Sequence, residues 1–154
     1  ARVLGMPPRE LACDVIAARH VKRLDLGKIN NYFFLNSAQI INAPVRLECG
    51  TYSITPTTET NTIRICNVAS ERNGHSDPTD CILEAIITPI ENRWFAKKNL
   101  RATVVPFTKI RIAATGEEHA SILTDEQIIL KTPADVEIAP RKLRTIVGTN
   151  RLFN

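Results

Sequence analysis

The sequence predicts an all-β fold: an antiparallel β-sandwich or barrel of about 8–11 short strands, with room for one N-terminal helix. The first observation is composition. The 154 residues include 18 Ile, 9 Val and 15 Thr, and these β-branched side chains pack well on a pleated sheet. The second is the alternation of polar and apolar residues at 45–49, 62–66, 109–112 and 135–138. A sheet with one buried and one wet face requires that alternation.

The positions of the strands follow from these runs and from the prolines between them. Successive runs begin about 8–12 residues apart, which is typical of a sandwich or barrel rather than of alternating β-α units. A proline at the end of a run costs no central hydrogen bond of a sheet. Six prolines fall there: Pro44, Pro56, Pro89, Pro106, Pro133 and Pro140. We expect strands near 31–35, 38–41, 44–49, 51–55, 62–68, 81–88, 101–105, 108–113, 127–131, 135–138 and 143–147.

Two segments carry helix signals. In 8–27, Pro8 suits the first helical turn and Gly27 suits the residue after the end, although 24–26 alternates as a strand does. In 124–127, a Thr and a Gln three residues apart resemble a capping box that opens a short helix to about Lys131. The alternative for this second segment is a loop that leads into a strand at 127–131.

Length and composition predict a single β-rich domain over residues 1–154. With 44% hydrophobic and 23% charged residues, the chain is unlike disordered, collagenous or low-complexity sequences. Its apolar runs are far shorter than the roughly 20 residues that span a bilayer, so we expect no membrane span. Neither a signal peptide nor an Asn-x-Ser/Thr glycosylation site is found, and we expect an intracellular protein, cytoplasmic or nuclear.

The cysteines are expected to be free thiols. Cys13, Cys49, Cys66 and Cys81 form no Cys-x-x-Cys pair and the three histidines are scattered, so the sequence predicts no local metal site. Cys66 and Cys81 lie in apolar runs, where a reduced cysteine packs as a small hydrophobe. Because the P-loop, zinc-protease and EF-hand motifs are also missing, we expect no cofactor.

The net charge of +4 is the sum of strong local blocks. Residues 1–30, 31–92, 93–111, 112–137 and 138–154 carry +3, −4, +6, −5 and +4. This layout favours oriented contact with a charged partner: nucleic acid, an acidic protein surface or another copy of the chain.

The most basic block contains the leading candidate site. Its cations alternate with aromatic residues, and cations neutralise phosphates while aromatic faces stack bases in single-strand binding on β-barrels. The candidate nucleic-acid-binding residues are Trp94, Phe95, Lys97, Lys98, Arg101, Lys109 and Arg111. If the strands at 101–105 and 108–113 are adjacent, their basic faces form one stripe. The competing interpretation places the aromatic residues in the core and the cations on a solvated edge strand.

The sequence offers less support for a catalytic site. Loop 69–80 gathers the side chains that such a site would need: Ser70, His75, Ser76, Asp77 and Asp80. A Ser-His-Asp device, however, is built from distant segments rather than from one loop. Asp77 and Asp80 could bind a cation together, although such residues more often begin turns.

These features favour a non-enzymatic binding module for single-stranded nucleic acid. The alternative is a self-assembling structural subunit, as in a capsid or shell, or a protein adaptor whose charge blocks pair between copies and give a homo-oligomer. An enzyme that works from loop 69–80 ranks third. On balance, the sequence favours a protein without enzymatic activity.

Overall fold

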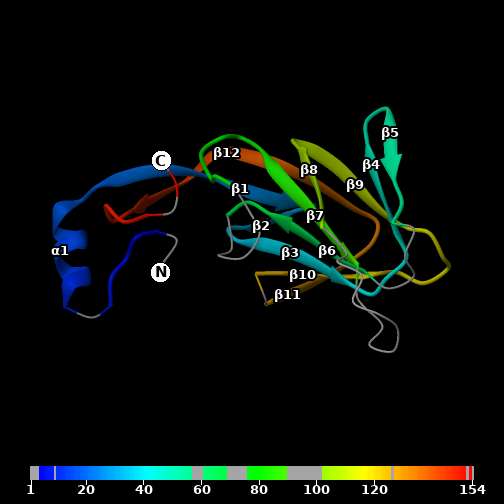
Figure 1. Cartoon of the computed structure of the whole chain (residues 1–154), viewed down its shortest axis with the longest axis horizontal. Coiled ribbons are helices and arrows are strands. Elements are labelled where there is room, and N and C mark those ends of the chain that lie inside the picture. The colour runs from blue at the N-terminus through cyan, green and yellow to red at the C-terminus, as the bar shows by residue number, and fades with distance from the viewer. Residues whose placement is uncertain are drawn as a thin grey trace.

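The structure, a computed structural model, describes residues 4–8, 10–56, 61–68, 76–89, 102–125, 127–151 and 153. Within these residues the chain forms one helix, α1 (Leu11–Ala18), and twelve strands in two antiparallel sheets (Figure 1). The first sheet has the order β2 (Tyr32–Phe34), β1 (Val21–Ile29), β12 (Ala134–Ile146), β9 (Lys109–Ala114), β4 (Val45–Cys49) and β5 (Tyr52–Ile54). The second sheet has the order β11 (Ile128–Lys131), β10 (Ser121–Thr124), β3 (Ser37–Ile41), β6 (Asn61–Cys66), β7 (Leu83–Pro89) and β8 (Thr103–Phe107).

The sheets bury one hydrophobic core between them. Alternation determines which side chains enter it: Ile110 and Ile112 of β9 are buried, whereas Lys109 and Arg111 between them are exposed. The largest fully buried side chains include Phe34, Leu47, Ile63, Ile65, Leu83, Ile112 and Ile122. The predicted all-β sandwich is therefore confirmed, and the barrel alternative is not, because each sheet ends in edge strands.

The N-terminal helix is shorter than predicted. It ends at Ala18, because Arg19 adopts a left-handed φ of 52°, and β1 begins at Val21. The helix prediction is wrong for 21–27, since pairing of β1 with β12 takes precedence over local helix signals. No helix in the described segments is long and apolar enough to cross a bilayer.

The capping-box helix at 124–127 is also wrong. Thr124 ends β10, Asp125 has a positive φ of 45°, and β11 begins at Ile128. The segment is the turn of a hairpin, as the loop alternative predicted, because residues 121–124 pair with 128–131.

One long strand replaces the two expected at 135–138 and 143–147. β12 runs from Ala134 to Ile146 and continues past Pro140 through a bulge at which Arg141 has a φ of 52° and the register with β1 shifts. The ribbon of β1 and β12 extends beyond the sandwich toward α1 (Figure 1). A second, smaller cluster lies there, formed by Leu24, Val147 and Phe153 with Leu4, Leu35 and Leu143 packed against it.

Candidate functional site

Several buried polar side chains gather at the end of the second sheet where β6 and β10 end and β3 and β7 begin. A polar group in an apolar core costs free energy unless it is hydrogen-bonded, so such a cluster marks a constrained site. Of the six buried polar residues among those described, Asp25, Asn67, Ser76 and Thr124 lie at this end, whereas Asn61 and Thr132 lie at the opposite end of the second sheet. Hydrogen bonds connect Asp25 and Asn67 to each other and to three further segments: 35–36, 78–81 and the bulge at Arg141. We call this set the loop junction: Asp25, Leu35–Ser37, Asn67, Ser76–Ile82, Asp125 and Arg141.

Asp25 is the centre of the loop junction. Its side chain is fully buried in β1, where Oδ2 accepts a hydrogen bond from the backbone N of Cys81 (2.8 Å) and Oδ1 accepts one from the backbone N of Arg141 (2.7 Å). Both donors have a positive φ, of 62° and 52°, which non-glycine residues adopt at a cost. The backbone N of Asp25 also donates to the carbonyl O of Pro78 (2.7 Å). Asp25 thus holds the segment before β7 against the bulge of β12.

Asn67 connects this centre to the segment between β2 and β3. Its Nδ2 donates to the carbonyl oxygens of Asp25 (2.8 Å) and Leu35 (2.9 Å), and its backbone N donates to the carbonyl O of Asn36 (3.0 Å). The side-chain Oδ1 is buried and has no hydrogen-bond partner among the described residues. A buried acceptor without a partner costs free energy, which offsets part of the stability that the two Nδ2 hydrogen bonds contribute.

The turn before β7 presents carboxylates beside Asp25. Asp77 Oδ1 accepts hydrogen bonds from the backbone N (2.9 Å) and Oγ1 (2.6 Å) of Thr79. Asp80 Oδ1 accepts one from the backbone N of Ile82 (2.9 Å), which leaves Oδ2 without a hydrogen bond to any residue that the structure describes. The turn interpretation of Asp77 and Asp80 is therefore the one that the structure bears out.

Asp80 differs electrostatically from an ordinary surface aspartate. Partial burial raises the pKa of its carboxyl, and the negative charges of Asp77, Asp25 and Glu84 raise it further, against the opposing effect of the hydrogen bond from Ile82 N. Carboxyls with a raised pKa are over-represented at functional sites, because a group that must accept a proton benefits from it.

Asp125 fixes the opposite side of the loop junction. Its carboxylate accepts hydrogen bonds from three successive backbone N–H groups: Leu35 to Oδ2 (2.7 Å), and Asn36 (2.9 Å) and Ser37 (3.0 Å) to Oδ1. One side chain on the β10–β11 turn therefore sets the path of the chain from β2 into β3.

In the described segments, the potential metal ligands do not cluster and the cysteines are free. No three His, Cys, Asp or Glu side chains there are placed to hold a metal ion. All four cysteines lie within those segments as free thiols. Burial raises the pKa of Cys66 to about 11, so this thiol is a core residue and a poor nucleophile.

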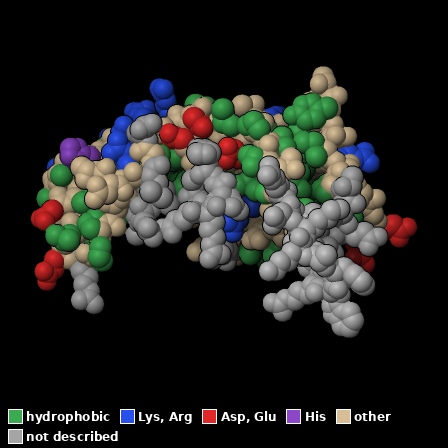
Figure 2. All heavy atoms as spheres, viewed as in Figure 1, with side chains coloured by type: hydrophobic (Ala, Val, Ile, Leu, Met, Phe, Trp, Pro, Cys, Tyr) green, Lys and Arg blue, Asp and Glu red, His purple; other side chains and the backbone are tan. Residues whose placement is uncertain are grey.

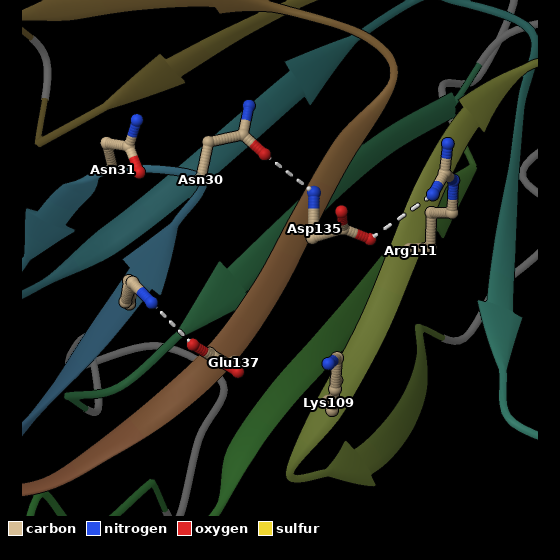
Figure 3. Close-up of a pocket in the computed structure, with 7 residues that line it drawn as sticks. Asn30, Asn31, Lys109, Arg111, Asp135 and Glu137 are labelled. Atoms are coloured by element: carbon tan, nitrogen blue, oxygen red, sulfur yellow. Dashed lines mark hydrogen bonds and ion pairs between the residues drawn. The ribbon is translucent and has the colours of Figure 1, made fainter.

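A polar hollow of about 570 Å³ lies on the outer face of the first sheet (Figure 3). Its lining residues are Lys28, Asn30, Asn31, Lys109, Arg111, Asp135 and Glu137. Their charges are paired across strands: Lys28 Nζ lies 2.7 Å from Glu137 Oε1, and Arg111 Nη1 lies 3.8 Å from Asp135 Oδ1. Lys28, and to a smaller extent Lys109, lower the pKa of Glu137.

The predicted nucleic-acid site is only partly visible. Trp94, Phe95, Lys97, Lys98 and Arg101 lie outside the described residues. Lys109 and Arg111 share the outer face of β9, as predicted, but β8 belongs to the other sheet, so the expected stripe across the two strands does not form. The acidic partners of β9 come from β12 of the same chain, which means that the opposite charge blocks meet within one molecule.

Sequence reasoning missed the residues that organise the loop junction. Of loop 69–80, residues 69–75 lie outside the described residues, and 76–80 form the turn before β7. Asp25, Asn67 and Asp125 carried no functional prediction. The available signal was a polar residue directly beside apolar strand positions, as in Leu24-Asp25-Leu26 and Cys66-Asn67-Val68.

Comparisons with known proteins give a fold but no family model. No protein-family model matches the chain, and no curated protein matches it. Solved structures do match. One Bacillus anthracis protein described as a diacylglycerol kinase aligns over 96% of this chain with a TM-score of 0.77 and 21% identity. Two described as candidate diacylglycerol kinases from the same organism align over 96% with TM-scores of 0.80 and 0.74 and identities of 17% and 18%.

The chain has the fold found in these kinases. At such identities the likeness shows the fold alone, and the chain spans 62–64% of the length of the three matched structures. The prediction of a non-enzymatic binding module, for nucleic acid or for self-assembly, is contradicted because the matched proteins are described as diacylglycerol kinases. The expectation that the chain is more likely not an enzyme is contradicted by the same match. Of the predicted binding residues, Arg111 is paired with Asp135 of the same chain, so its charge is partly neutralised within the molecule.

Proposed function

We propose that the chain is the β-sandwich part of a lipid kinase related to diacylglycerol kinases. The observation that carries this proposal is the structural match over 96% of the chain at a TM-score of 0.80. In such a reaction the hydroxyl oxygen of a diacylglycerol bonds to the γ-phosphorus of ATP, the bond to the β,γ-bridging oxygen breaks, and ADP leaves. The hydroxyl proton must pass to a base, and a carboxylate commonly fills that role.

The loop junction is the part of this chain best suited to the reaction. Asp25 and Asp125 accept hydrogen bonds from backbone N–H groups with both carboxylate oxygens, which suits them to holding loops. Asp80 is exposed and the pKa of its carboxyl is raised. Its Oδ2 accepts no hydrogen bond from the residues that the structure describes. We therefore assign Asp80 the role of accepting the proton from the lipid hydroxyl.

The test is transfer of radiolabelled γ-phosphate from Mg-ATP to diacylglycerol in phospholipid vesicles. The complete native protein is used, because this chain spans under two thirds of the matched kinases. We expect phosphatidic acid as the product, and a loss in kcat of about 100-fold or more for Asp80→Asn, the usual size of an acid–base contribution.

Asp135→Asn is the matched control, since it removes an exposed carboxylate in the polar hollow. We expect it to leave kcat within about twofold, in line with the small energies of surface ion pairs. Absence of any lipid phosphorylation by the complete protein contradicts the proposed function. Equal activity of Asp80→Asn and Asp135→Asn contradicts the role given to Asp80 alone.

A further inference from the structure

The part of β1 and β12 that extends beyond the sandwich is strongly basic. We call residues 21–24 of β1 and 141–146 of β12 the basic ribbon. Neither stretch contains an Asp or a Glu, and the cations are Lys22, Arg23, Arg141, Lys142 and Arg144. Figure 2 shows Lys and Arg side chains gathered over this part of the molecule, at the upper left, beside a group of acidic side chains.

Two arginines of the basic ribbon lie directly opposite each other. Arg23 pairs with Arg144 in the register of β1 and β12, and both residues are exposed. Neither side chain forms a hydrogen bond or an ion pair with any residue that the structure describes. Like charges directly opposite each other in a sheet are destabilising. The fold therefore holds two guanidinium groups together without neutralising them.

The arginine pair lies beside the loop junction. Arg23 is two residues before Asp25 in β1, so the alternation of a strand places the two residues on one face. Asp25 is bonded to the turn before β7: its backbone N donates to the carbonyl O of Pro78 (2.7 Å), and its Oδ2 accepts from the backbone N of Cys81 (2.8 Å). Asp80, the proposed base, belongs to that turn.

The carboxylate of Asp25 does not neutralise the arginine pair. Its two oxygens accept hydrogen bonds from the backbone N of Cys81 and of Arg141. Both guanidinium groups are therefore available to an anion that comes from outside the described chain. They are charged at every physiological pH, whatever the protonation state of nearby carboxyls.

A phosphate group is the anion that this place requires. The planar N–H donors of a guanidinium match phosphate oxygens, often with two parallel hydrogen bonds. A carboxylate would suit one arginine as well. However, the proposed reaction brings the γ-phosphorus of ATP to the lipid hydroxyl whose proton Asp80 accepts, so the polyphosphate must lie next to Asp80.

We propose that Arg23 and Arg144 bind the phosphate chain of ATP beside Asp80. The inference rests on the proposed function, because that function supplies both the nucleotide and the role of Asp80. The two arginines bind and orient the anion and take no part in proton transfer. Bound phosphate oxygens offset the repulsion between the two like charges, which stays uncompensated while the site is empty.

Calorimetric titration of the complete native protein with Mg-ATP tests the proposal. Arg23→Gln and Arg144→Gln each remove one guanidinium group, and we expect the dissociation constant to rise at least about tenfold in each, as loss of a charged hydrogen bond does. Lys22→Gln is the matched control, because it removes the same charge from the opposite face of the same strand. We expect it to change the dissociation constant by about twofold or less.

Thermal unfolding separates a binding role from a structural one. Without nucleotide, we expect each Gln variant to melt at the temperature of the parent or slightly above it, because one of two opposed like charges is gone. Mg-ATP should raise the melting temperature of the parent more than that of either variant. Arg144→Lys keeps the charge but loses the planar donors, so its dissociation constant should lie between those of the parent and Arg144→Gln.

Three results overturn the proposal. The first is binding of Mg-ATP that is equal in the parent and both Gln variants; if the complete protein still phosphorylates diacylglycerol, the proposed function stands. The second is weaker binding together with a lower melting temperature, which makes the arginines structural. The third is an equal loss in Lys22→Gln, which shows only general attraction by the basic ribbon.

An anionic phospholipid is the other source of a phosphate group. Sedimentation of the complete protein with phosphatidylglycerol vesicles, without nucleotide, distinguishes it. Lipid binding that is lost in both Gln variants while Mg-ATP binding persists assigns the arginines to a lipid headgroup and overturns the proposal. Weaker Mg-ATP binding by both Gln variants of a protein that does not phosphorylate diacylglycerol supports the arginine pair and contradicts the proposed function.

Discussion

The polar hollow and the loop junction both concentrate charged and polar groups, but they hold them in opposite ways. In the hollow, exposed cations and carboxylates pair with each other across strands, as Arg111 does with Asp135. In the loop junction, carboxylates bond to backbone N–H groups, as Asp25 does with those of Cys81 and Arg141. A surface ion pair contributes little to stability, whereas a buried carboxylate that satisfies backbone donors determines where loops lie.

The largest expected effect comes from removing the centre of the loop junction. Asp25→Ala leaves two backbone N–H groups without their acceptor in a fully buried position, and we expect a loss of about 3–5 kcal/mol in the free energy of unfolding. Urea unfolding followed by circular dichroism measures it. The same measurement on Asp135→Ala in the hollow is expected to differ from the parent by about 0.5 kcal/mol or less. Similar losses in the two variants would remove the contrast between the regions.

Asn67→Ala tests the second bonding residue of the loop junction. It removes the two hydrogen bonds to the carbonyl oxygens of Asp25 and Leu35, which costs stability. It also removes the buried Oδ1 that has no partner among the described residues, and this gain offsets part of the loss. We expect a loss of about 1–3 kcal/mol in the same urea experiment. A variant as stable as the parent would show that the amide contributes nothing to the connection between the two segments.

The sequence could predict the elements far better than their connections. Alternation at 45–49 and 109–112 identified β4 and β9 nearly to the residue, because one wet and one dry face dictate that pattern. It did not identify β1, where local helix signals in 8–27 compete with pairing to a strand more than a hundred residues away, as the separation of 109 residues between Lys28 and Glu137 illustrates.

The loop junction could not be predicted for a similar reason. The structural role of Asp25 depends on the backbone N–H groups of Cys81 and Arg141, which lie far away in the sequence. Residues 24–26 alone do not indicate those partners. Charge blocks, by contrast, are visible in the sequence. Their pairing partner was assigned to another molecule, although β12 supplies it to β9 within the chain.

Glu137→Gln tests how much the ion pair between Lys28 and Glu137 in the polar hollow contributes to stability. Because Lys28 lowers the pKa of Glu137, the pair stabilises the fold above the ordinary glutamate pKa of 4.5, and that contribution is lost as the pH falls through the lower value of the folded state. Solvent screens this pair, so we expect the melting temperature of the variant to lie only slightly below that of the parent at neutral pH. Melting temperatures of parent and variant at neutral and acidic pH test the expectation; a difference that grows in acid contradicts it.

The smallest expected effect has the opposite sign. Burial and the nearby carboxylates raise the pKa of Asp80, so its charged form costs stability at neutral pH. Asp80→Asn keeps the acceptor for Ile82 N, and we expect a slightly higher melting temperature at neutral pH. The gain disappears as the pH falls below the ordinary aspartate value of 3.8, where both folded and unfolded states bind the proton. A lower melting temperature at neutral pH would contradict this account of the site.

The pairing of β1 with β12 has a consequence for how the molecule is made. β1 is synthesised before the other strands that the structure describes, but one of its two neighbours in the first sheet is β12, the last of those strands in the sequence. Until then β1 has only the three-residue β2 beside it, and its other edge stays open. Such non-local pairing slows folding and leaves a hydrogen-bonding edge exposed to other nascent chains. The open edge of β1 therefore stays available for pairing with other chains until β12 has been synthesised.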